Sequence, residues 1–368
     1  MMKKCFAVVL LLICGTAQAQ WVRTNGPGIS PATCLAVEGS AVFAGTQSSG
    51  LFRSTDHGNI WIASDSGLPA NSRIISLLAD DPNLFASLEQ GVFMSSDRGL
   101  HWSKTNLSGS FLVKAQNRIF IGGQYSDDHG AHWSAYDNSQ GPDGLTSLGS
   151  TLFCSTGDKG VFSSTDQGMH WTACNNGITD HTLLAIATIG ETLLASSRYV
   201  GVYRSTDSGK SWQNSSDGIQ QGHSLFSFAV IGNLVFAGGP QIYVSSDFGS
   251  YWTNAHKGIN GSPVDFLASD STYLYGGQYN MVFRRPVTDF TSAAVDIERD
   301  QRFLISPNPA KNLATVPHAT VTNMLGATVL DISNHDHSDL KLDISNLPAG
   351  TYFVRSEGSS TLQKLTKE

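Results

Sequence analysis

The stretch G-V-Y-R-S-T-D-S-G-K-S-W, residues 201–212, decides the fold because its second part recurs along the chain. The pattern S-x-D-x-G-x-x-W occurs six times, at residues 54–61, 95–102, 126–133, 164–171, 205–212 and 245–252. Its aspartates lie 31 to 41 residues apart and are Asp56, Asp97, Asp128, Asp166, Asp207 and Asp247. A repeat with a period near 40 that contains several short strands is typical of a β-propeller.

Each repeat is predicted to be a four-stranded antiparallel meander. Around Asp207, apolar runs at 183–190, 192–196, 201–205 and 212–215 are separated by turn residues. The eight-residue pattern, called the box below, then spans the turn between the third and fourth strands. We expect its Asp to accept backbone N–H groups, its Gly to adopt positive φ, and its Trp to fill the gap between neighbouring units. The six aspartates are therefore predicted to be structural rather than catalytic.

The units add up to seven blades over residues 20–290. Segments 264–269, 272–276 and 281–285 match the first three strands of a unit, and no box follows them. Residues 21–29 resemble the ends of other units, so Trp21 to Asn25 are predicted to pair with 281–285 as the missing fourth strand. Such pairing closes the ring and removes an open sheet edge. The third blade lacks the G-[VL]-[FY] segment before Ser126, which leaves open whether it has all four strands.

Composition and the first 19 residues indicate export. The formal charge is −7 and the chain has no basic run, which argues against nucleic acid and anionic membrane surfaces as partners. Lys3 and Lys4, the apolar run 6–13 and A-Q-A at 17–19 predict a signal peptide over residues 1–19, too short in its apolar part for a membrane span. A lipoprotein signal at Cys14 is disfavoured because Ile13 stands where a small residue is expected.

The remaining cysteines, Cys34, Cys154 and Cys174, are predicted to be free, buried thiols. Their spacing is not that of a metal site, and no cofactor or metal is predicted. The cluster H-D-H-S-D at 335–339 is expected to be a solvated loop, since nothing nearby completes a coordination shell.

After a polar linker at 291–302, residues 303–368 are predicted to form a small β-sandwich. This segment resembles the type A sorting domain of the bacterial type IX secretion system through P-N-P at 307–309, a strand–Leu-Gly–strand hairpin around 325–326 and L-P-A-G-T-Y-F-V at 347–354. It departs from the pattern in being short between Asn312 and Val321. The resemblance implies a translocon and a sortase as partners, passage through the periplasm, and a product that is released or held at the cell surface.

The repeat resembles the Asp-box, or BNR, family, which includes sialidases, xyloglucanases, the sortilin luminal domain and the photosystem II assembly factor family. The form G-[VL]-[FY]-x-S-[TS]-D-x-G-x-x-W is most similar to the last group. The resemblance implies an all-β, seven-bladed β-propeller with a binding or interaction function, and a sialidase-like or xyloglucanase-like glycoside hydrolase is the alternative.

The sialidase alternative needs three arginines around a carboxylate, a Tyr/Glu pair and an acid Asp. The segment F-R-R-P at 283–286 follows the last box, whereas the similar sialidase motif precedes the first. Arg53, Arg204 and Arg284 share one repeat position, which favours a structural role. Glu38 and Glu191 are predicted to lie on the box side of the ring, away from the expected binding face.

That binding face is formed by the loops joining second to third strands and fourth to first strands. Its candidate ligand-binding residues are Glu89, Gln90, His181, Arg198, Tyr199, His223, Gln278 and Tyr279. The set is polar and aromatic and has no converging carboxylates. It predicts an extracellular protein, peptide or glycan as ligand rather than catalysis.

Overall fold

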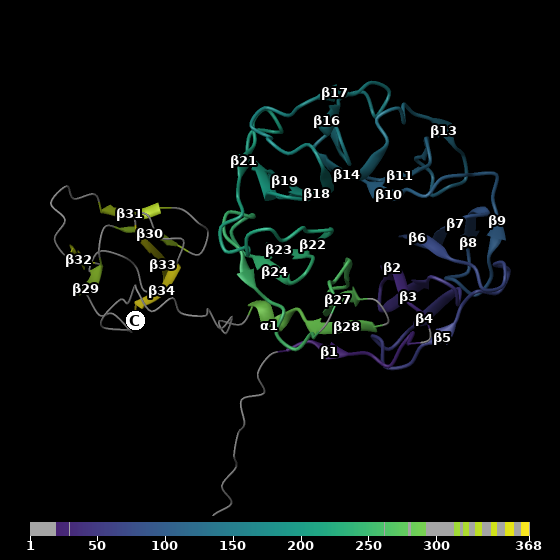
Figure 1. Ribbon diagram of the computed structural model, residues 1–368, viewed down its shortest axis with the longest axis horizontal. Coiled ribbons are helices and arrows are strands. Elements are labelled where there is room, and N and C mark those ends of the chain that lie inside the picture. Colours follow the sequence, from purple (N-terminus) through teal and green to yellow (C-terminus); the bar gives the residue numbers. More distant parts are fainter. Residues whose placement is uncertain are drawn as a thin grey trace, which may run out of the picture.

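Seven four-stranded antiparallel sheets surround a central axis in the computed structural model (Figure 1). The structure describes residues 20–28, 30–260, 262–278 and 281–291, and six strands between 313 and 367. The first strands of neighbouring sheets contact one another around the whole ring, from β2 to β26 and back to β2. The prediction of an all-β, seven-bladed propeller is confirmed.

The first three blades follow the chain in order. Blade 1 contains β2 (Ala32–Glu38), β3 (Ala41–Thr46), β4 (Leu51–Ser54) and β5 (Ile62–Ala63). Blade 2 contains β6 (Ile74–Asp80), β7 (Asn83–Leu88), β8 (Gly91–Ser95) and β9 (Ser103–Lys104). Blade 3 contains β10 (Leu112–Ala115), β11 (Arg118–Ile121), β12 (Gln124–Ser126) and β13 (Ser134–Ala135), so it has all four strands and only its third is shortened.

Three more blades and a composite one complete the ring. Blade 4 contains β14 (Pro142–Leu148), β15 (Thr151–Thr156), β16 (Gly160–Ser164) and β17 (Thr172–Ala173). Blade 5 contains β18 (Leu183–Ile189), β19 (Thr192–Ser197), β20 (Gly201–Ser205) and β21 (Gln213–Asn214). Blade 6 contains β22 (Ser227–Ile231), β23 (Leu234–Gly238), β24 (Ile242–Ser245) and β25 (Thr253–Asn254). Blade 7 contains β26 (Phe266–Ser269), β27 (Tyr273–Gln278), β28 (Met281–Pro286) and the N-terminal β1 (Val22–Arg23), and the short helix α1 (Thr288–Thr291) follows it.

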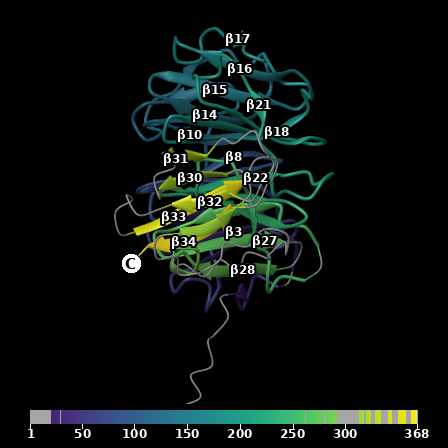
Figure 2. The ribbon, with the colours of Figure 1, turned by 90° about the vertical axis from the view of Figure 1, so that its left-hand side faces the viewer.

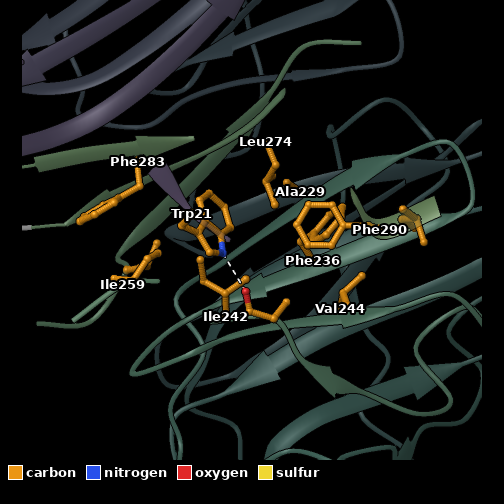
Figure 3. Packing of buried hydrophobic residues seen from close by; sticks show 12 residues of the cluster. Trp21, Ala229, Phe236, Ile242, Val244, Ile259, Leu274, Phe283 and Phe290 are labelled. Carbon is orange, nitrogen blue, oxygen red and sulfur yellow. Dashed lines mark hydrogen bonds between the residues drawn. The ribbon is translucent and has the colours of Figure 1, made fainter. Parts of the chain in front are cut away.

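The predicted ring closure is present in blade 7. Strand β1 pairs with β28, with Val22 opposite Arg284, and the sheet order is β1-β28-β27-β26. The indole of Trp21 is 2% exposed and lies in a cluster with Ile242, Ile259 and Phe283 (Figure 3). Its Nε1 donates a hydrogen bond of 2.7 Å to the carbonyl of Ala255 in blade 6, drawn dashed in Figure 3. The N-terminus therefore joins two blades by both backbone pairing and side-chain packing.

The six boxes share one hydrogen-bonding pattern. In the box of Asp207, Oδ1 accepts from the Ser205 hydroxyl at 2.8 Å and from the Ser211 backbone N–H at 2.9 Å. The Ser205 hydroxyl also accepts from the Gly209 N–H at 2.9 Å. The glycine has positive φ as expected, and so does the residue before it, Ser208, at 59°. The equivalent residues of the other five boxes also have positive φ, a strain that the turn accommodates through its three internal bonds.

The box tryptophans connect blades. The indole N–H groups of Trp102, Trp212 and Trp252 donate to carbonyls of Ser64, Cys174 and Ser215 in the preceding blade, at 2.8–2.9 Å. Trp171 does the same to Asp137. Trp133 instead bonds within its own turn and packs edge-on against Phe85 of blade 2. The predicted filling of the gap between blades is thus accompanied by a cross-blade indole bond for four of the six box tryptophans, whereas the buried Nε1 of Trp61 has no hydrogen-bond partner among the described residues.

The C-terminal strands form two small sheets. They are β29 (Leu313–Val316), β30 (Ala319–Asn323), β31 (Thr328–Ile332), β32 (Leu340–Asp343), β33 (Gly350–Ser356) and β34 (Leu362–Lys367). Strand β29 pairs with β32, and the second sheet has the order β31-β30-β33-β34 (Figure 2). Strand β29 was not expected, because the segment between Asn312 and Val321 is short. The predicted signal peptide at residues 1–19, residues 292–302 of the predicted linker and the cluster at 335–339 lie outside the described residues.

Candidate functional site

The two faces of the ring carry different loops. Antiparallel pairing places the turns between first and second strands, and the boxes, on one face. We call this the box face. The loops between second and third strands, and the connections from each fourth strand to the next blade, lie on the opposite face, the rim face. The rim face holds a pocket of about 380 Å³ formed by loops of blade 5 and the connection to blade 6. Its polar lining residues are Tyr199, Asn214, Ser216, Gln220, Gln221 and His223.

One wall of the pocket is a loop held at several points. The Ser197 hydroxyl accepts the backbone N–H groups of Tyr199 and Val200, at 3.1 and 3.0 Å. Ser197 in turn donates to Asp180, whose carboxylate also accepts from Tyr199 N–H at 3.3 Å. On the other side, Ser224 donates to the carbonyl of Arg198 at 2.6 Å. The Tyr199 side chain nevertheless points out and the residue is 68% exposed. The loop thus presents an aromatic ring on an anchored backbone.

Two buried tyrosines fix the connections on either side of this loop. Tyr203 OH accepts the backbone N–H of Asp180 at 2.9 Å. Tyr243 OH accepts the backbone N–H of Gln220 at 3.2 Å and lies 2.8 Å from His223 Nδ1. The same position holds phenylalanine in blades 1, 2, 4 and 7, as Phe52, Phe93, Phe162 and Phe283. This Phe-to-Tyr difference was visible in the sequence and would have singled out blades 5 and 6.

The pocket carries no formal charge. None of its lining residues is Asp, Glu, Lys or Arg. Burial lowers the pKa of His223, so its imidazole is neutral at neutral pH. Burial, and secondarily His223, also lower the pKa of the neighbouring His256. The site therefore offers neutral donors and acceptors beside an exposed ring.

The predicted rim residues have different locations. Tyr199 and His223 line the pocket, Arg198 adjoins it, and the exposed His181 belongs to the connection between blades 4 and 5. Glu89 and Gln90 form the β7–β8 turn on the other side of the ring (Figure 1). The expectation for Gln278 is corrected: it is 1% exposed and its amide donates to Ser262, because β27 extends to this residue. Tyr279 lies outside the described residues. Gln221, which the sequence also places in a loop of this face, lines the pocket, and sequence reasoning missed Asn214, Ser216 and Gln220.

The acidic residues of the box face serve cross-blade pairs. At three boundaries between blades, an acidic residue ends the first strand of one blade or directly follows it. Its side chain contacts the residue that comes after the box aspartate of the next blade. The pairs are Glu38–Arg98 at 3.9 Å, Asp80–His129 at 2.9 Å and Asp270–His57 at 3.2 Å. The 2%-exposed side chain of Asp80 also accepts from Lys114 at 2.5 Å. Burial, followed by the nearby Asp81, raises the pKa of Glu38 to about 7. The repeated position indicates a role in joining blades.

The repeated arginines also contact the next blade. Arg204 Nε donates to the carbonyl of Phe248 at 2.9 Å, and Arg284 donates to that of His57. Both carbonyls belong to the residue after a box aspartate. Arg53 lies 5.8 Å above the Phe43 ring instead. Among the residues with described positions, no group of three or more His, Cys, Asp or Glu could hold a metal ion, and Cys34, Cys154 and Cys174 are free.

Comparison with protein families identifies the C-terminal part. Residues 304–368 match the model of the secretion system C-terminal sorting domain. This domain directs secretion to the outer surface through the type IX machinery. Within the described chain, no helix has the length and hydropathy needed to span a membrane. No curated protein matches the chain.

Comparison with solved structures supports the fold alone, since all identities are low. YCF48 from Cyanidioschyzon merolae matches with 14% identity and a TM-score of 0.56, over 73% of this chain and 98% of that one. The extracellular domain of BT4673 from B. thetaiotaomicron matches with 11% identity and a TM-score of 0.58, over 94% of this chain and 52% of that one. Inactive virginiamycin B lyase from Staphylococcus aureus matches with 11% identity and a TM-score of 0.57, over 73% of this chain and 98% of that one. The protein is a secreted seven-bladed β-propeller with a C-terminal sorting domain.

Proposed function

We propose that this protein is a non-catalytic binding module that acts outside the cell and holds its ligand in the pocket between blades 5 and 6. The observation that supports this most directly is the anchored loop that exposes Tyr199. A binding site whose backbone is already fixed loses little conformational entropy when the ligand arrives. The ligand is an extracellular protein, peptide or glycan.

The neutral lining supports binding over catalysis. Most glycoside hydrolases place two carboxyl groups on either side of the scissile bond, and a sialidase needs a Tyr/Glu pair and an acid Asp, whereas the pocket lining contains neither Asp nor Glu. The fold does not decide between the two functions, because it is shared with a lyase and with a YCF48 structure described as bound to D1 peptide.

The route to this location is also part of the proposal. A signal peptide over residues 1–19 takes the chain to the periplasm. The sorting domain then docks on the outer-membrane translocon, and a sortase removes it, so that the propeller is released or held at the surface. The match of residues 304–368 supports the docking step.

The binding proposal is tested on arrays of extracellular proteins and glycans with the chain lacking residues 1–19. We expect at least one ligand whose binding falls more than tenfold in the double variant Tyr199→Ala, His223→Ala. The matched control is Asp158→Ala, which changes the equivalent residue of the β15–β16 loop in blade 4 and should bind normally. Binding that is equally lost in Asp158→Ala, or retained in the double variant, would place the site elsewhere.

The glycoside hydrolase alternative comes from the Asp-box resemblance, and one feature of the structure favours it: burial raises the pKa of Glu38, as a general acid requires. If Glu38 were this acid, Glu38→Gln would abolish release of reducing sugar from extracellular polysaccharides without unfolding the protein. We expect instead no hydrolysis by the native chain and an altered unfolding temperature in the variant, consistent with the cross-blade position of Glu38.

A further inference from the structure

We infer that the pocket between blades 5 and 6 binds one uncharged sugar ring of a glycan, with the Tyr199 ring against a face of the sugar and neutral side chains around its hydroxyls. This inference rests on the proposed binding function and specifies the ligand class of the same site. Four features of the pocket support it: polar side chains without hydrogen-bond partners among the described residues, a lining without charged residues, the exposed ring of Tyr199, and the volume of the pocket.

The unused polar groups match hydroxyls. In the described part of the chain, the side-chain amides of Gln220 and Gln221 make no hydrogen bond, and both residues are exposed. His223 uses Nδ1 with Tyr243, which leaves Nε2 for a ligand. An amide offers both donors and an acceptor, and a hydroxyl is at once a donor and an acceptor. A polyol can therefore satisfy all of these groups, whereas an apolar ligand would bury them unpaired at a cost in affinity.

The absence of charge selects against anionic and cationic ligands. A phosphate or carboxylate placed in the pocket would lose hydration without gaining a counter-ion from the lining residues. Arg198 adjoins the pocket, but the bond that fixes it to Ser224 is made by its backbone carbonyl, and its side chain is not part of the lining. Neutral hydroxyl-rich ligands avoid this penalty.

The exposed tyrosine supplies the apolar contact. A pyranose ring carries C–H groups on its faces and hydroxyls at its edge, so it needs a flat apolar partner beside polar groups. Tyr199 is 68% exposed on a loop bonded through Asp180, Ser197 and Ser224. Tyrosine is suited to such a position because it loses little entropy and has both an apolar ring and a polar hydroxyl.

The volume indicates a single ring or a chain end. At about 380 Å³ the pocket lies near the lower limit of ordinary ligand sites. The glycan would extend from the open side of the pocket into solvent. Affinity for one residue is then expected to be weak, with Kd on the order of 1 mM, which corresponds to about −4 kcal/mol.

The test uses saturation-transfer NMR and titration calorimetry on the chain lacking residues 1–19. The probes are methyl β-D-glucopyranoside, methyl β-D-galactopyranoside, methyl α-D-mannopyranoside, methyl β-D-glucuronide and the capped peptide N-acetyl-trialanine amide. We expect at least one neutral glycoside to bind, with the strongest saturation on the C–H groups of one ring face. Binding should disappear in Tyr199→Ala, persist in Tyr199→Phe, and weaken about tenfold in Gln220→Ala, Gln221→Ala. Asp158→Ala is the unaffected control.

Each other outcome overturns the inference. Binding of the glucuronide as tight as that of the glucoside would contradict the selectivity for neutral ligands. Tyr199-dependent binding of the peptide with no glycoside bound would assign the pocket to peptides and leave the proposed binding function standing. Glycoside binding that survives Tyr199→Ala would place the sugar elsewhere on the molecule. If no probe binds and the array ligands are also insensitive to Tyr199→Ala, both the inference and the proposed function fail.

Discussion

A single hydroxyl distinguishes blades 5 and 6 from their neighbours at the residue scale. Tyr203 and Tyr243 replace a repeated phenylalanine and use the added oxygen to hold backbone N–H groups of the connections that frame the pocket. The ring itself remains buried, at 1% exposure in both cases. The substitution therefore changes a loop on the rim face without changing the core of the blade.

Removing that oxygen should weaken binding and lower stability, each by a modest amount. Tyr243→Phe keeps the ring and leaves the Gln220 N–H and His223 Nδ1 without their partner. The loss of each neutral hydrogen bond costs about 1 kcal/mol, and we expect an affinity loss of roughly fivefold together with a small fall in unfolding temperature. Calorimetric titration with an array ligand measures the affinity, and thermal unfolding measures the stability. Phe162→Tyr in blade 4, which adds an oxygen away from the pocket, is the control.

The box aspartate should stabilise the fold and leave the ligand untouched. Asp207→Ala removes the acceptor of the Ser205, Ser211 hydroxyl and Ser211 N–H bonds. We expect a lower unfolding temperature and an unchanged affinity per folded molecule. A variant of normal stability that no longer binds would show that the box belongs to a site.

The same aspartate should respond to acid in a defined range. Hydrogen bonds from Ser211 and then Ser205 lower the pKa of Asp207 to about 2, compared with about 3.9 in an unfolded chain. A lowered pKa means that the folded state binds protons more weakly, so this stabilisation is complete above about pH 4 and is lost as pH falls towards 2. Chemical unfolding between pH 2 and 5 should show a smaller loss in Asp207→Asn than in the native chain. Parallel curves for the two proteins would contradict this assignment.

Individual elements depend on contacts between blades, and the composite blade is the clearest case. Strand β1 has only two residues, yet Trp21 beside it is buried among residues of blades 6 and 7 (Figure 3). Thr24 adds a backbone bond of 2.9 Å to Val282. The strand alone contributes little pairing, so the tryptophan must carry much of the closure energy.

Deleting residues 20–26 should therefore destabilise the whole ring. The deletion leaves β28 as an exposed edge and empties the Trp21 site, which alone is expected to cost about 3–5 kcal/mol. We expect a large fall in unfolding temperature or aggregation, compared with little effect from deleting residues 292–298. Trp21→Ala should reproduce much of the loss. If the N-terminal deletion unfolds at the temperature of the full chain, closure does not depend on this strand.

A buried carboxylate joins blades 2 and 3 in a comparable way. Asp80 is contacted by Lys114 and His129, both from blade 3, and its side chain is 2% exposed. Asp80→Ala leaves Lys114 without its partner, and because Lys114 is partly exposed we expect a loss of about 2–3 kcal/mol, below the range for fully buried pairs. Urea unfolding measures this value. Asp81→Ala, next to it and well exposed, should change stability by less than about 0.5 kcal/mol.

At the scale of the whole molecule, the number of blades and their closure could be predicted because the box repeats and because 21–25 resembles other fourth strands. The pocket could not be predicted, because it needs loops from two blades whose relative position only the ring defines. Gln278 shows the limit: its place in a loop between strands suggested exposure, yet β27 extends through it and buries its amide. The side chains of Gln220 and Gln221 could be assigned to a binding pocket only because the structure places Tyr199 beside them.

Export should depend on the C-terminal domain as a unit. Deleting residues 304–368 removes the whole matched sorting domain and leaves the propeller strands intact. We expect the truncated protein to accumulate in the periplasm and to disappear from the surface and medium, as measured by fractionation and immunoblotting. Unchanged levels outside the cell would contradict this prediction. Deletion of 292–298 controls for a shortened chain.

The composite blade also sets the order of events as the chain is made. Thr24 and Val282 are partners 258 positions apart, so the first strand to emerge must wait, unpaired, for the last. Contacts this distant in sequence form slowly. Until the chain has been made as far as residue 286, where β28 ends, the first six blades can assemble only as an open arc whose two end blades each lack a neighbour on one side. A chain of this kind can become a closed ring only at the final step, when β28 is available to pair with β1.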